Sequence, residues 1–121
     1  MAYNENLADR IRESMATHEN VEEKLMFGGV CFMLNGKMCV GVVKDEMMCR
    51  IDPKIYLQAL EKKGCREMVF TGKPMNGYVY VSEEGMKSKD EFEYWIRLCV
   101  EFNSIAKATK KKVKEKKLKL N

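Results

Sequence analysis

The sequence has little histidine and proline, and each scarcity excludes a class of protein. The single histidine, His18, lies in the polar stretch Thr-His-Glu-Asn, and no nucleophile motif accompanies it, so a histidine-based triad is not supported. Two prolines and no Ser/Gly-rich run give no sign of an interdomain linker. No apolar run approaches the roughly 20 residues that span a bilayer, and the polar, amphipathic beginning is not a signal peptide.

Closely spaced cysteines are also missing, which argues against a structural zinc site. The five cysteines are Cys31, Cys39, Cys49, Cys65 and Cys99. Structural zinc sites use close pairs such as Cys-x2-Cys, and no such pair occurs here. Their odd number and apolar surroundings favour reduced, buried thiols in a cytoplasmic protein. Cys31 and Cys39 flank one hairpin and could be neighbours across its strands, but we predict no metal, no cofactor and no catalytic residue.

A net positive charge occurs only toward the C-terminus, because residues 1–106 hold 14 basic and 17 acidic residues. Residues 107–121 contain eight lysines and one glutamate, or +7, whereas residues 1–106 carry −3. We therefore predict one domain over 1–106 and a flexible, solvated tail over 107–121. The alternative is weak, sequence-independent contact with nucleic acid. The residues that would make this contact are Lys110, Lys111, Lys112, Lys114, Lys116 and Lys117.

The first half of the chain has the pattern of a helix followed by a strand meander. Leu7, Ile11 and Met15 recur with a helical period after a possible cap at Asn4 or Asn6. Apolar runs then predict strands over residues 25–27, 30–34, 37–43 and 47–51. Asn35-Gly36 is a strong signal for a two-residue hairpin turn between two of them.

The second half predicts a helix, two strands and a final helix. Asp52-Pro53 begins the helix and Gly64 ends it. Strands are expected over 68–70 and 78–81 around a loop over 71–77. Ser88 and Glu91 form a capping box for the last helix, which we expect to fray into the lysine tail. The order predicts an α+β two-layer sandwich, with an antiparallel meander sheet and helices on one face.

Two features of the apolar segments need a separate interpretation. Gly28-Gly29 lacks the Lys-Ser/Thr and the following helix of a phosphate loop, so it predicts a bulge or tight bend. The chain also holds ten methionines. Methionine fills irregular cores, but a partly exposed methionine-rich sheet face would serve as a docking surface.

Several ordered segments resemble the TfoX N-terminal domain family. They are Met26-Phe27-Gly28-Gly29-Val30, Phe32-Met33-Leu34-Asn35-Gly36, Met48-Cys49-Arg50-Ile51, Phe70-Thr71-Gly72-Lys73-Pro74-Met75, Gly77-Tyr78-Val79-Tyr80-Val81 and the last helix with Trp95 and Ile96. The resemblance covers about residues 18 to 108. The family is named for a bacterial regulator of natural competence, which has a second, helical domain. It implies a fold similar to type III secretion chaperones, and it supplies no catalytic residues.

The first hypothesis is therefore a non-enzymatic, regulatory protein-interaction module, present as a monomer or homodimer. Its contact residues would lie on the sheet face and the loop before the last strand, at Arg50, Lys73, Met75 and Tyr78. The alternatives are nucleic-acid binding through the tail, and a small ligand bound between sheet and helices near Arg50, Tyr56 and Tyr78.

Overall fold

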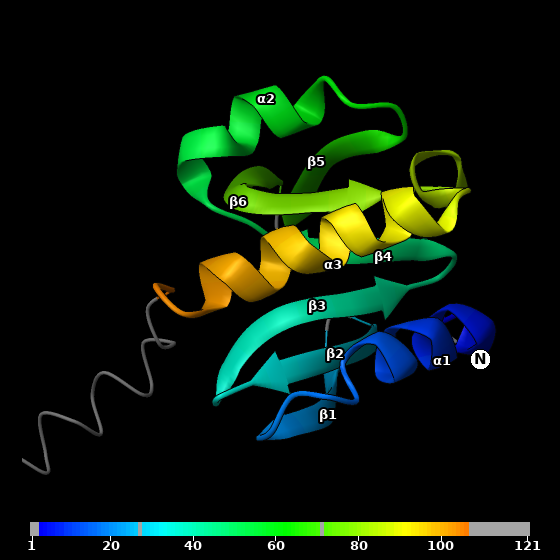
Figure 1. The fold of residues 1–121 in the computed structure, drawn as a ribbon. Helices are drawn as coiled ribbons and strands as arrows, with labels where there is room; N and C mark the ends of the chain where they lie inside the picture. The colour runs from blue at the N-terminus through cyan, green and yellow to red at the C-terminus, as the bar shows by residue number, and fades with distance from the viewer. Residues whose placement is uncertain (1–2, 27, 71, 107–121) are drawn as a thin grey trace, which may run out of the picture.

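A computed structural model describes residues 3–26, 28–70 and 72–106, which form one antiparallel sheet and a layer of helices. The helices are α1 (Glu5–Ser14), α2 (Tyr56–Leu60) and α3 (Lys89–Asn103), with 3-10 turns η1 (Pro53–Ile55) and η2 (Glu83–Met86). The strands are β1 (Val21–Met26), β2 (Gly29–Leu34), β3 (Lys37–Val43), β4 (Glu46–Arg50), β5 (Cys65–Phe70) and β6 (Lys73–Val81). Their order in the sheet is β1-β2-β3-β4-β6-β5 (Figure 1). The predicted α+β sandwich and its element order are confirmed.

Tight turns join the strands of the meander, as predicted. Asn35 and Gly36 both have positive φ, 56° and 79°, which is the geometry of the two-residue hairpin turn. Gly28 has φ 78° in the turn between β1 and β2, so the Gly-Gly pair is a tight bend and not a phosphate loop. Lys44, with φ 55°, begins the turn between β3 and β4.

The predicted loop over 71–77 is wrong, because most of it belongs to β6. This strand begins at Lys73, and Pro74 already pairs with Val69 of β5. Only the later part of β6, from Tyr78, also pairs with β4. Lys73 and Pro74 therefore have a strand neighbour on one side alone, where a proline without an amide hydrogen is tolerated.

Side-chain caps fix the N-termini of α1 and α3. Asn4 accepts a hydrogen bond from the Leu7 amide at 3.1 Å, so Asn4 and not Asn6 begins α1. Ser88 and Glu91 form both hydrogen bonds of the predicted capping box at the start of α3. α3 ends at Asn103, and the predicted lysine tail with its six candidate contacts lies outside the described residues.

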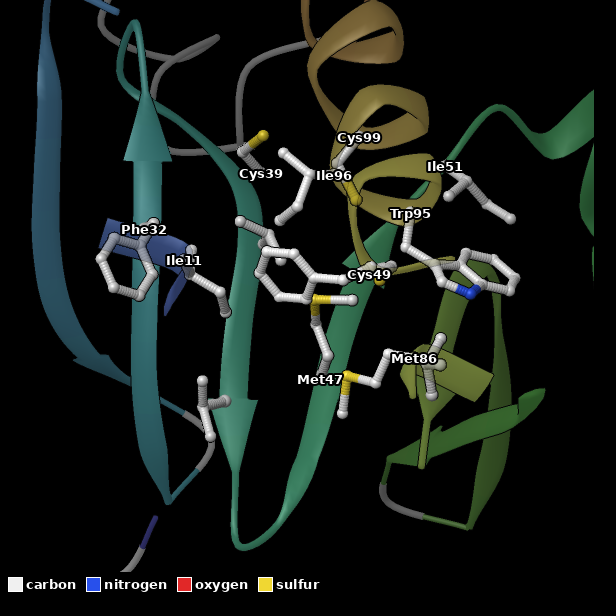
Figure 2. Packing of buried hydrophobic residues seen from close by; sticks show 14 of the residues in the cluster. Ile11, Phe32, Cys39, Met47, Cys49, Ile51, Met86, Trp95, Ile96 and Cys99 are labelled. Carbon is white, nitrogen blue, oxygen red and sulfur yellow. The ribbon is translucent and has the colours of Figure 1, made fainter. Parts of the chain in front are cut away.

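The main core lies between the helices and one face of the sheet. Ile11 of α1, Phe32 of β2, Met47 of β4 and Trp95 of α3 meet there, each at most 1% exposed (Figure 2). The Trp95 indole nitrogen donates to the carbonyl of Gly85 at 3.2 Å, which satisfies its one polar group. Within the described residues, no helix has the length and apolarity needed to cross a membrane.

Candidate interaction surface

The other face of the sheet carries a second apolar cluster built from strand residues, which we call the strand-only face. Five members are at most 5% exposed: Cys31, Met33, Met38, Met48 and Met68. Five half-buried side chains pack against them: Met26, Val43, Met75, Tyr78 and Tyr80. Strand alternation creates this face, because Phe32 and Met47 point to the helices while their neighbours Met33 and Met48 point away. Apart from Met47, the methionines of the six strands thus gather on the strand-only face.

Gly41 makes room for the centre of the cluster. It pairs with Cys31 on one side and Met48 on the other. A Cβ at this position would lie 2.7 Å from the Val30 carbonyl oxygen and 2.9 Å from Cε of Met48. The missing side chain leaves room for the end of the Met48 side chain, and Met48 is completely buried.

Long polar side chains close over part of this face. Arg66 of β5 lies over the ring of Tyr80, 4.7 Å from its centroid. The same guanidinium forms an ion pair with Glu46 of β4, with Nε 3.2 Å from the carboxylate. Because β6 lies between β5 and β4, this pair spans the strand that carries Tyr80. The apolar cluster therefore has a charged, solvent-facing rim.

The structure brings three of the four predicted contact residues onto this face. Arg50 ends β4 and pairs directly with Tyr78 of β6, with the guanidinium carbon 5.6 Å from the tyrosine ring centroid. It also lies 5.7 Å from the Phe102 ring of α3, so it links the sheet to the helix layer. Met75 packs against the cluster, and Lys73 is exposed two residues earlier on β6. We call the group of Arg50, Lys73, Met75 and Tyr78 the Arg50–Tyr78 corner.

The thiols do not form a reactive site. Cys31 belongs to the strand-only face and Cys39 to the helix-side core, so the expectation that they could be neighbours is wrong. A register shift after Phe32 pairs Cys31 with Gly41. Burial raises the pKa of Cys31 and of Cys65 to about 11, and it also raises the pKa of Cys39 and Cys99. Thiols held in this protonated state are poor nucleophiles at neutral pH.

The described part of the chain has no metal cluster, and two hollows in it do not include the residues considered for a small ligand. No group of three or more His, Cys, Asp or Glu residues there is arranged to hold a metal ion. Two open hollows of about 380 and 430 Å³ lie beside α3, one next to η2 and the other next to α1. Neither is lined by Arg50, Tyr56 or Tyr78, the residues considered for a small ligand. Tyr56 packs into the helix-side core, and His18 is exposed.

Sequence reasoning missed two members of the surface, Arg66 and Tyr80. Tyr80 packs against the cluster of the strand-only face. Arg66 lies on the same face because it pairs directly with Tyr80 across β5 and β6. The alternation of Tyr78, Val79, Tyr80 and Val81 gave the signal for Tyr80. No sequence signal pointed to Arg66, because the predicted strand over 68–70 began two residues after it.

One comparison with known proteins gives a match. The family model of the TfoX N-terminal domain matches residues 13–103, about three quarters of the chain. No curated protein and no solved structure matches. The matched range includes all six strands, α2 and α3, and therefore the whole strand-only face.

Proposed function

Because the chain belongs to the TfoX N-terminal domain family, we propose that it is a regulatory protein-interaction module of the cytoplasm, without enzymatic activity. The proposal places the contact surface at the Arg50–Tyr78 corner of the strand-only face. One observation supports it above all: a methionine-rich cluster lies on the sheet face opposite the helices, with half-buried side chains at its border.

Methionine suits a surface that must adapt to a partner. Its side chain is unbranched and polarisable, so it can repack against different shapes. The deepest members of the cluster, such as Met48 at 0% exposure, hold the sheet together and are not available for contact. Met75 and Tyr78 are only half-buried, so they can gain burial when a partner docks.

The charges beside these two residues support a partner of complementary charge. Lys73 is exposed next to Met75, and Arg66 is exposed beyond Tyr80. Arg50 adds a third cation at the end of β4. We infer a protein segment with an apolar side chain for the Met75–Tyr78 surface, flanked by carboxylates for the lysine and arginine.

Affinity purification with two matched variants tests this surface. Lys73→Glu reverses an exposed charge at the corner, and Lys54→Glu reverses an exposed charge on η1, the 3-10 turn that precedes α2. Quantitative mass spectrometry should show a partner with the wild type and Lys54→Glu that is at least tenfold depleted with Lys73→Glu. Equal recovery of the same proteins with all three chains would contradict the proposal.

A further inference from the structure

Strand β1 forms an open edge of the sheet. Figure 1 shows β1 at the border, with no helix or strand of the described residues beyond it. Its pairing with β2 is regular over the whole strand, without a bulge. The opposite edge, β5, has a register shift after Glu67 and contacts α2, two features that hinder edge pairing. Of the two edges, β1 is the one prepared to accept another strand.

The backbone groups that β1 presents to solvent can be identified from its ladder. The Asn35 amide donates to the carbonyl of Asn20 at 3.1 Å, so residue 20 belongs to a hydrogen-bonded pair. Such pairs alternate along an antiparallel ladder, so residues 22, 24 and 26 also direct their N–H and C=O groups to β2. Val21, Glu23 and Leu25 therefore direct theirs away from the sheet.

We propose that the partner of this edge is β1 of a second copy, paired antiparallel about a twofold axis at Glu23. In this register Val21 faces Leu25 of the second copy, and Glu23 faces its own counterpart. All the outward backbone groups of Val21, Glu23 and Leu25 then form hydrogen bonds between the copies. The two sheets become one continuous sheet, and this inference does not depend on the proposed contact surface.

Side-chain chemistry selects this register over its neighbours. Glu22 and Lys24, both exposed on the strand-only face, form two opposite-charge pairs across the axis. Shifting the axis by one residue toward either end would place Glu22 against Glu22 or Lys24 against Lys24. On the helix side, Leu25 is 78% exposed in one copy and would pack against Val21 of the other.

The Glu23 pair at the axis is already neutralised within each copy. Arg12 of α1 donates to both carboxylate oxygens of Glu23, from Nε at 2.6 Å and from a terminal nitrogen at 2.7 Å. Charged residues on an edge strand commonly prevent pairing between molecules. On β1 the order of the charges favours pairing instead, because Glu22 and Lys24 of one copy face Lys24 and Glu22 of an antiparallel second copy.

Charge reversal tests the pairing without disturbing the fold. Glu22→Lys and Lys24→Glu each turn both cross-axis pairs into like-charge pairs, and each should raise the Kd of the dimer about tenfold or more. The double variant Glu22→Lys/Lys24→Glu restores opposite charges and should dimerise like the wild type. A mixture of the two single variants should form a heterodimer, since lysines of one chain then face glutamates of the other.

The measurement is sedimentation equilibrium of the full chain, with circular dichroism to show that each variant is folded. A further variant, Leu25→Pro, removes one outward N–H that β2 does not use, and it should also abolish dimerisation. A wild type that stays monomeric up to about millimolar concentration overturns the proposal. A dimer that is indifferent to the single charge reversals, or single variants that do not associate when mixed, also overturns it.

Discussion

The two glycines of the first hairpin occupy their positions for different physical reasons. Gly28 has φ 78°, a conformation that other residues resist, but a Cβ there would meet nothing within 4 Å. Gly29 has no such φ, yet its Cβ would lie 1.9 Å from the carbonyl oxygen of Val42. The first glycine serves the turn, and the second serves the close approach of β2 to β3.

Alanine at these two positions should therefore have unequal costs. Gly28→Ala should lower the free energy of unfolding by about 1–2 kcal/mol, the cost of the left-handed conformation. Gly29→Ala should lower it by about 3 kcal/mol or more, because two backbone segments must separate. Urea unfolding of both variants measures the difference. Equal losses would show that the Gly29 contact has no role in stability.

The buried thiols predict how stability depends on pH. Burial raises the pKa of Cys31 to about 11 from an ordinary value of 9.0, so the folded state holds a proton that the unfolded chain releases sooner. This stabilisation is complete below about pH 9 and is lost as pH rises toward about 11. The pKa of Cys65 is raised in the same direction, mainly by burial.

We therefore expect the free energy of unfolding to fall between about pH 9 and about pH 11. Urea unfolding under reducing conditions across this range measures the slope. Cys31→Ala should flatten the slope, whatever it does to stability at neutral pH. A wild-type stability that does not change over the range would be inconsistent with protonated, buried thiols.

At the scale of elements, the start of α3 has the clearest local cause. Ser88 accepts from the Glu91 amide at 3.0 Å, and the Glu91 carboxylate accepts from the Ser88 amide at the same distance. Ser88→Ala should cost about 1 kcal/mol in a urea unfolding experiment. Ser82 is a matched control, because its side chain makes no capping hydrogen bond to η2. A smaller loss for Ser88→Ala than for Ser82→Ala would contradict this account.

Elements with local signals were predicted correctly from the sequence. The Asn35-Gly36 turn and the capping box each depend on neighbouring residues, and both are present. Asp52-Pro53 begins the 3-10 turn η1, and the α-helix that was predicted there begins at Tyr56. The first half of β6 was missed because glycine, proline and asparagine are typical of loops. Its strand conformation comes from pairing with β5, which the local composition does not record.

The candidate surface was only partly predictable for the same reason. The methionine count raised two interpretations, core packing and an exposed docking surface, and the structure places buried and half-buried methionines on the same face. Met48 is fully buried, whereas Met75 is half-buried. Cross-strand register decides which methionine lies where, and register shifts at Phe32 and Glu67 alter it in ways that single-strand patterns do not show.

For the whole molecule, charge separates two possible kinds of partner. Residues 1–106 carry −3, and the basic excess lies in residues 107–121. A negatively charged domain is a poor surface for a nucleic-acid backbone, so that alternative depends on the tail alone. The folded part instead offers an apolar cluster with local cations at one corner, which suits a protein segment.

The most direct test of the interaction surface is site-specific photo-crosslinking of the full chain in cells. A photoreactive residue replaces Met75 at the Arg50–Tyr78 corner in one variant, and Leu57, 75% exposed on α2, in another. The account predicts a discrete crosslink to another protein from position 75, lost when Lys73→Glu is added, and none from position 57. Crosslinks from position 57 alone, or to nucleic acid instead of protein, would contradict it.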